Sequence, residues 1–320
     1  MKINLDTSIG KIKLKNPVLV ASGTFGHAKE FEKFIDLKKL GGIVTKTITV
    51  KPRLGNPPTR IVETPSGMLN AIGLQNPGVE KFIEEKLPYL RKIGIPILVS
   101  VMGYSVEEFE AVMRRLEKEG GVDGYELNLS CPNVPYGASA TKASADSSAG
   151  AARMFAHDAE MIKQVVGAVR KITQKTLIAK LGPDVSDIAK MAMATESAGA
   201  DGVSLINTFT AMVIDIQTRK PVLANKTGGL SGPCIRPIAV RMVYDVYKAV
   251  KIPIMGMGGI MNSRDALEFF IAGATAIQVG TANFMNPRAS MEILEDLEKF
   301  MENERIKNIS ELVGSINEHE

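Results

Sequence analysis

Two stretches of the chain, Ala198-Gly-Ala-Asp-Gly-Val-Ser-Leu-Ile-Asn207 and Ala272-Gly-Ala-Thr-Ala-Ile-Gln-Val-Gly-Thr281, decide the fold class. Each begins with Ala-Gly-Ala, which is typical of a helix end, and continues into a short apolar run that is typical of a buried strand. The weak repeat predicts a chain built from alternating strands and helices. Such alternation favours parallel β/α units.

Apolar runs of this kind recur along the whole sequence. They are Pro17–Ser22, Gly42–Lys46, Pro96–Gly103, Tyr125–Ser130, Leu177–Leu181, Gly202–Asn207, Ile252–Gly259 and Ala276–Thr281. Amphipathic segments lie between them, among them Val106–Glu119, Ala159–Ile172, Val185–Ala198 and Ile238–Val250. Eight strands that are apolar throughout predict a closed (β/α)8 TIM barrel, because both faces of such a sheet are covered. A doubly wound open sheet is the alternative.

The N-terminal residues precede this pattern. Ile3–Lys15 alternates apolar and polar residues around Ser8-Ile-Gly10, which predicts a β-hairpin. We expect residues 1–320 to form a single TIM-barrel domain that begins with this hairpin.

The composition excludes several classes of protein. Apolar residues make up 45% and charged residues 23% of the chain, and the net charge of +4 is not concentrated in any block. This favours a soluble enzyme or binding protein and argues against nucleic-acid binding. Two cysteines suggest a reducing cytoplasm, and they are too few to hold an iron–sulfur cluster. No apolar run is long enough to span a membrane, and the N-terminus lacks a signal-peptide core.

Polar residues follow the predicted strands, at the rim where TIM barrels carry their active sites. Lys46 and Lys180 each stand near the end of an otherwise apolar run. One such lysine could simply extend its ammonium to water, but two on the same rim favour an anion or cofactor site. Gly256-Met-Gly-Gly259 and Gly280-Thr281 follow the last two strands, where this fold commonly binds phosphate. Tight turns are the alternative explanation for these glycines.

A cysteine lies at the same rim, in Asn128-Leu-Ser-Cys-Pro-Asn133. A thiol there can act as a base, and the flanking amides can bind a planar polar substrate through paired hydrogen bonds. A half-buried structural cysteine is the alternative. We interpret the second cysteine, Cys234, as structural. His27, His157 and His319 show no metal-ligand spacing, so we expect surface histidines and no metal site.

Three connections are unusual for a barrel. Val50–Lys86 and Thr208–Pro237 are long, rich in Gly, Pro and Asn, and expected on the active-site face. Ala138–Ala152 consists mostly of Ala and Ser and lacks an apolar face for packing, so it is either a mobile loop or a weak helix.

Several motifs together resemble those of the dihydroorotate dehydrogenase family, and of the catalytic subunit of its NAD-linked, two-subunit class in particular. They are Ala21-Ser-Gly-Thr-Phe-Gly26, Val44-Thr-Lys-Thr47, Gly67-Met-Leu-Asn-Ala-Ile-Gly-Leu-Gln-Asn-Pro-Gly78, Asn128-Leu-Ser-Cys-Pro-Asn133, Asn225-Lys-Thr-Gly-Gly-Leu-Ser-Gly-Pro233 and Gly256-Met-Gly-Gly-Ile260. The Asn70–Asn76 form and the cysteine resemble this class rather than the membrane-bound class, which uses a serine base and an N-terminal membrane segment.

The resemblance implies oxidation of dihydroorotate to orotate in pyrimidine (UMP) biosynthesis, with FMN as the cofactor and Cys131 as the catalytic base. The residues implied to bind FMN are Ser22, Lys46, Thr47, Ser100, Asn128, Lys180, Ile206, Gly232, Gly258, Gly259, Gly280 and Thr281. Those implied to bind substrate are Lys46, Asn70, Ile72, Gly73, Leu74, Asn128, Asn133, Asn207 and Thr208.

The resemblance also implies a partner, an electron-transfer subunit that carries FAD and a 2Fe-2S cluster and passes electrons to NAD. It further implies a homodimer within a heterotetramer. The lack of cluster ligands and of a Gly-x-Gly-x-x-Gly motif after any strand agrees with this division of labour.

One departure from the family concerns residues 138–152, which lengthen the loop that closes over the substrate in the family. An insertion in this active-site lid leaves open the alternative of a flavin-binding subunit with impaired turnover. A separate alternative is another enzyme, either a fumarate-linked single-subunit relative or another FMN barrel reductase.

Overall fold

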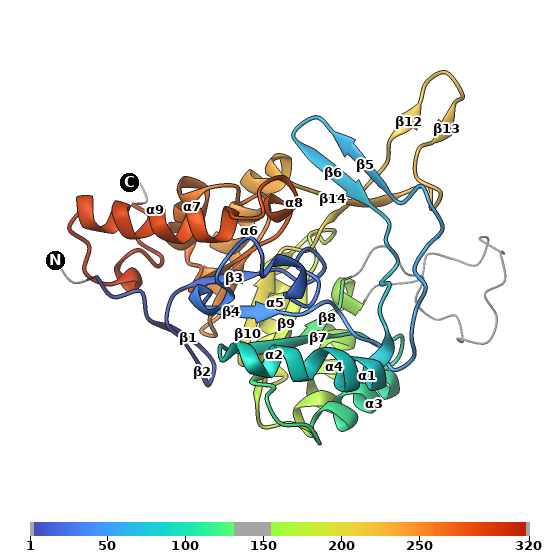
Figure 1. Ribbon diagram of the computed structural model, residues 1–320, viewed down its shortest axis with the longest axis horizontal. Helices are drawn as coiled ribbons and strands as arrows, with labels where there is room; N and C mark the ends of the chain where they lie inside the picture. Colours follow the sequence, from blue (N-terminus) through green and yellow to red (C-terminus); the bar gives the residue numbers. More distant parts are fainter. Residues whose placement is uncertain (1–2, 131–154, 318–320) are drawn as a thin grey trace.

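The computed structural model describes residues 3–130 and 155–317, and its central element is a closed barrel of eight parallel strands (Figure 1). The chain order of the strands is also their order around the barrel, with β16 pairing with β3 to close the ring. The predicted TIM barrel is therefore confirmed, and the open-sheet alternative is wrong. The strands are β3 (Val18–Val20), β4 (Gly42–Val44), β7 (Ile97–Val101), β8 (Gly124–Asn128), β9 (Thr176–Leu181), β10 (Gly202–Leu205), β15 (Ile254–Gly256) and β16 (Ala276–Val279).

Helices surround the barrel and bury one face each against it. Ser105, Asp158, Asp187 and Asn262 cap the helices that follow them by accepting hydrogen bonds from first-turn N–H groups. The amphipathic segments predicted from the sequence all form helices, with ends that differ by a few residues. The helices are α1 (Gly78–Lys81), α2 (Leu87–Ile93), α3 (Val106–Leu116), α4 (Ala159–Arg170), α5 (Ile188–Ser197), α6 (Arg236–Ala249), α7 (Ser263–Ala272), α8 (Ala282–Met285) and α9 (Ala289–Asn303).

The predicted N-terminal hairpin is confirmed, and it closes one end of the barrel. Strands β1 (Thr7–Ile9) and β2 (Ile12–Leu14) pair antiparallel through a turn at Gly10. The apolar side chains of the hairpin pack against a layer of barrel residues at the N-terminal ends of the strands. This buried cluster consists of Ile9, Ile12, Leu14, Leu19, Val44, Leu98, Ile178, Met255 and Ala276.

The barrel interior changes from apolar to polar toward the C-terminal ends of the strands. Ser100, Glu126, Lys180, Ser204 and Gln278 are all buried there, on five different strands. Buried polar side chains need hydrogen-bond partners or a ligand to offset the loss of water. The polar layer therefore lies where a binding site is expected in this fold.

The two long connections meet in a second sheet, which the sequence did not indicate. Strands β5 (Ile61–Thr64) and β6 (Gly67–Asn70) belong to the first connection, and β11 (Phe209–Ala211) and β14 (Gly228–Ser231) belong to the second. They form an antiparallel sheet in the order β11-β14-β6-β5, on the side of the barrel away from the β1–β2 hairpin (Figure 1). A small hairpin, β12 (Ile214–Asp215) and β13 (Lys220–Pro221), extends beyond it.

Candidate functional site

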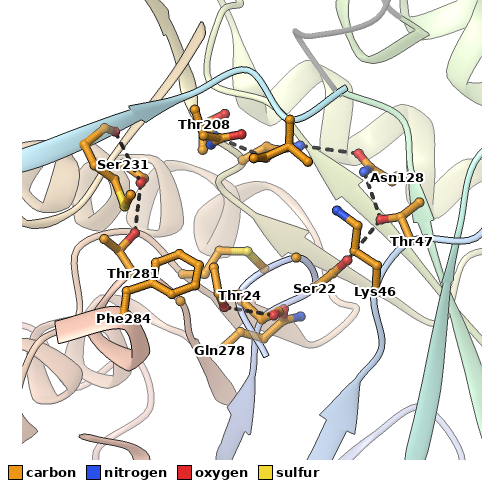
Figure 2. A pocket seen from close by; sticks show the side chains of 18 of the residues that line it. Ser22, Thr24, Lys46, Thr47, Asn128, Thr208, Ser231, Gln278, Thr281 and Phe284 are labelled. Carbon is orange, nitrogen blue, oxygen red and sulfur yellow. Dashed lines mark hydrogen bonds between the residues drawn. The ribbon is translucent and has the colours of Figure 1, made fainter. Parts of the chain in front are cut away.

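A cavity of about 420 Å³ opens at the C-terminal ends of the barrel strands, between the barrel and the second sheet. This volume lies within the range of small-molecule and cofactor sites, which is roughly 300–1,000 Å³. Two lysines, several amides and hydroxyls and a set of glycines line it together with apolar side chains (Figure 2). The cavity can therefore hold a ligand that has both an apolar part and charged or polar groups.

Most of the described residues that the resemblance implied do line this cavity. They are Ser22, Lys46, Thr47, Asn70, Ile72, Gly73, Leu74, Asn128, Lys180, Ile206, Asn207, Thr208, Gly258, Gly259, Gly280 and Thr281. Asn70 and Ile72–Leu74 arrive from the first long connection, and Asn207 and Thr208 begin the second. The long connections thus contribute one wall, as their expected position on the active-site face indicated.

Two of the implied residues lie behind the cavity wall rather than in it. Ser100 is fully buried, and its Oγ lies 2.9 Å from Thr47 Oγ1. Gly232 is packed behind Gly259, because a Cβ atom on Gly259 would lie 2.8 Å from the Gly232 carbonyl oxygen. Both residues can shape the wall from behind. Cys131 and Asn133, like the Ala138–Ala152 stretch, lie outside the described residues.

A chain of hydroxyls and amides fixes the polar wall. Thr47 Oγ1 lies 3.0 Å from Ser22 Oγ and accepts a hydrogen bond of 3.3 Å from Asn128 Nδ2. Asn207 Nδ2 donates to Ser130 Oγ at 3.1 Å and to Asn128 Oδ1 at 3.3 Å. These bonds orient the amides before any ligand binds, which lowers the entropic cost of recognition.

The glycine loops after β15 and β16 form another part of the wall. Gly259 has a φ of +76° and no room for a side chain, since Arg236 Cβ and the Gly232 carbonyl would both lie 2.8 Å from a Cβ atom. Gly280 is different: a Cβ atom there would meet only Ala21 and Thr24, at 3.7 and 3.9 Å. At Gly280 the missing side chain leaves open volume for a ligand.

The structure brings in functional candidates that the sequence did not single out. Gln278 lines the cavity and is fully buried, and its Oε1 atom has no hydrogen-bond partner among the described residues. Its Nε2 donates to Glu126 Oε2 at 2.8 Å, so the amide is oriented with Oε1 left as a spare acceptor. The sequence did carry one signal for this residue, because Gln278 is a polar residue within the otherwise apolar strand Ala276–Val279.

His27 corrects the expectation of surface histidines. It lines the cavity and is only 9% exposed, whereas His157 is exposed as expected and His319 lies outside the described residues. Burial lowers the pKa of His27 to about 4, an effect that the nearby Glu30 carboxylate opposes and the Lys86 and Lys46 ammonium groups reinforce. His27 is therefore neutral in the folded protein near pH 7.

This burial predicts a measurable pH dependence of stability. Between pH 6.5 and about 4, unfolded His27 is protonated and folded His27 is not, so stability falls as the pH falls through this range. Phenylalanine suits this position because the neighbouring ring is that of Phe82. In His27→Phe, the free energy of unfolding should therefore fall by about 3 kcal/mol less than in wild type over this pH range. Urea unfolding of both proteins from pH 7 to 4 measures the effect. If the free energy of unfolding depends on pH in the same way in both proteins, His27 does not contribute to the pH dependence of stability.

Other types of site find no support in residues 3–130 and 155–317. No group of three or more His, Cys, Asp or Glu there could hold a metal ion. Nor does this part of the chain contain a helix long and apolar enough to cross a membrane.

Comparison with known proteins identifies the family. Residues 4–301 match the family model described as dihydroorotate dehydrogenase. A protein of Trichlorobacter lovleyi, named "Dihydroorotate dehydrogenase B (NAD(+)), catalytic subunit", is 50% identical over 99% of this chain and 99% of its own length. Proteins of the same name from Geotalea uraniireducens and Caldicellulosiruptor bescii are each 50% identical over 98% of this chain, covering 99% and 100% of their own lengths. The chain therefore belongs to the dihydroorotate dehydrogenase family.

Proposed function

We propose that this chain oxidises dihydroorotate to orotate, with FMN bound in the cavity and Cys131 as the base, and that a partner subunit passes the electrons to NAD. The observation that carries the proposal is the cavity itself, where two lysines, three asparagines and the glycine loops meet at the strand ends. The names of relatives that cover nearly the whole chain support the substrate, the NAD linkage and the role as one subunit of an assembly.

The residues present fit FMN. Gly258, Gly259, Gly280 and Thr281 lie on the loops that commonly hold phosphate in this fold and would hold the FMN phosphate. Lys180 and the spare Gln278 Oε1 supply a cation and an acceptor, which suits the polar edge of a flavin ring. When bound, FMN would supply the acceptor for the hydride that leaves the substrate.

The chain's own residues would supply the proton transfer and the positioning. Cys131, as a thiolate, would take a proton from the ring carbon adjacent to the one that bears the carboxyl group. The carboxyl-bearing carbon itself would release the hydride. A free thiol has a pKa of about 8.5, so the reaction should accelerate as the pH rises toward that value. Asn70, Asn128 and Asn207 would hold the substrate ring through their amides, together with Asn133.

Steady-state assays with different acceptors test this function. The isolated chain should produce orotate from dihydroorotate when an artificial dye accepts the electrons, and it should not reduce NAD at a useful rate. Adding an iron–sulfur flavoprotein subunit that carries FAD should confer NAD reduction. Efficient NAD or fumarate reduction by the chain alone would contradict the two-subunit proposal.

Gly280 offers a separate test of the cofactor site. Gly280→Leu should fold, because its Cβ has room, but the rest of the side chain would occupy cavity volume. We expect FMN affinity to fall by about 10- to 100-fold, the usual effect of 1–3 kcal/mol of overpacking. FMN titration of the apoprotein measures this, with Gly167→Ala in α4, where a Cβ meets nothing within 4 Å, as the control. Unchanged FMN affinity in Gly280→Leu would remove this loop from the FMN site.

A further inference from the structure

The carboxylate of Glu126 lies inside the barrel, two residues before Asn128, which lines the cavity. It is fully buried on β8. Its Oε2 atom accepts hydrogen bonds from Ser204 Oγ at 2.9 Å and from Gln278 Nε2 at 2.8 Å. Two neighbours on β10 and β16 therefore fix the orientation of the carboxylate.

The second oxygen of Glu126 faces a cation. Glu126 Oε1 has no hydrogen-bond partner among the described residues, and it lies 3.9 Å from Lys180 Nζ. The strand register explains why the Glu126 and Lys180 side chains lie close together. On β9, Lys180 pairs with Ser204 of β10 on one side and with Asn128 of β8 on the other, and Glu126 stands two residues before Asn128 on the same interior face.

Electrostatics favours a functional explanation over a structural one. A buried carboxylate costs several kcal/mol of desolvation, and an ion pair at 3.9 Å without a direct hydrogen bond offsets that cost poorly. An apolar residue in the same place would pack the barrel at lower cost. The carboxylate's position is useful, however, if it holds Lys180 at the cavity and balances its charge.

We propose that Glu126 is a positioning residue that directs the Lys180 ammonium into the floor of the cavity and sets the charge that Lys180 presents there. The same carboxylate orients the Gln278 amide, whose spare Oε1 acceptor remains for a ligand N–H group. The consequence for catalysis rests on the proposed function. If FMN binds here, Glu126 weakens the positive field of Lys180 and so lowers the tendency of the flavin to accept electrons.

A double-mutant cycle on the apoprotein tests the pairing without any cofactor. Glu126→Gln and Lys180→Met should each destabilise the fold, because each leaves one buried charge unpaired. If the two residues form a pair, the effects of the two substitutions should not add. The folding equilibrium constant of the double variant should exceed the value expected from adding the two single effects by at least about tenfold. The same comparison holds if Glu126→Gln alone fails to fold, since the double variant should then recover folding. Additive effects, or no recovery, would overturn the pairing.

The flavin midpoint potential of the holoprotein tests the role of the pair. Glu126→Gln should raise the potential by about 30 mV or more, which is a tenfold shift of a two-electron equilibrium. In the Lys180→Met background the same substitution should shift it less. Glu117→Gln is the matched control, because Glu117 accepts hydrogen bonds from Tyr125 and Thr173 and does not line the cavity.

The outcomes separate this proposal from the proposed function. A wild-type protein that binds no FMN contradicts the proposed function, and the apoprotein cycle still decides the pairing. A folded Glu126→Gln holoprotein whose potential matches that of wild type and Glu117→Gln would show that Glu126 is only structural.

Discussion

Cys131→Ser is expected to slow flavin reduction by dihydroorotate about 10²–10⁴-fold at neutral pH, the usual contribution of a general base, while FMN stays bound. A serine hydroxyl ionises far less readily than a thiol, so in a site built around a cysteine it should take the substrate proton much more slowly than the thiolate does. The described residues just before Cys131 belong to the site, because Asn128 lines the cavity and Ser130 accepts a hydrogen bond from Asn207. Anaerobic stopped-flow absorbance measures the rate directly.

The other cysteine provides the matched control for this experiment. Cys234 does not line the cavity, and its Sγ lies 3.7 Å from the Ser231 carbonyl oxygen. Cys234→Ser should therefore reduce its flavin at the wild-type rate. A Cys131→Ala variant that also does so would remove Cys131 from the mechanism.

Lys180→Met is expected to slow flavin reduction about 10²–10³-fold, the typical loss when one preorganised charge-stabilising group is removed. Lys180 is 5% exposed and lines the cavity, so its ammonium acts in a site with little water to screen it. The substitution also leaves Glu126 unpaired and should cost roughly 3–5 kcal/mol of stability.

A lysine at the opposite end of the same strand separates the two effects. Lys175 directly precedes β9, pairs with Glu117 at 3.5 Å and does not line the cavity. Lys175→Met should leave the rate of flavin reduction unchanged. Equal rates for Lys180→Met, Lys175→Met and wild type, measured at full FMN occupancy, would show that Lys180 does not stabilise developing charge.

The barrel could be predicted from the sequence because its signals are local. Each strand is a short continuous apolar run, and each amphipathic helix shows its own period of 3.6. The hairpin at Ile3–Lys15 was visible for the same reason, through alternation with a period of two. The rim position of Lys46 and Lys180 then followed from the general rule that barrel sites lie at the C-terminal ends of the strands.

The second sheet could not be predicted in this way, because its pairing is not local. Strand β6 pairs with β14, which lies in the other long connection, and each strand contributes only four residues. Short strands rich in glycine carry weak propensity signals. Their pairing depends on the barrel bringing the two connections to the same face.

The buried polar residues in the cavity wall and beneath it were missed for a different reason. Glu126 and Gln278 stand inside apolar runs, where a single polar residue does not change the strand prediction. Only the closed barrel shows that both point inward and meet at 2.8 Å. His27 was expected at the surface because a lone histidine carries no signal of its burial.

Anaerobic titration of the yellow holoprotein with dihydroorotate tests the proposed function most directly. We predict that the absorbance of oxidised flavin is lost and that orotate is released in proportion to the FMN reduced, with a faster reaction as the pH approaches the thiol range. A flavin that stays oxidised at saturating dihydroorotate, although a chemical reductant bleaches it, would contradict the proposal that this cavity oxidises dihydroorotate.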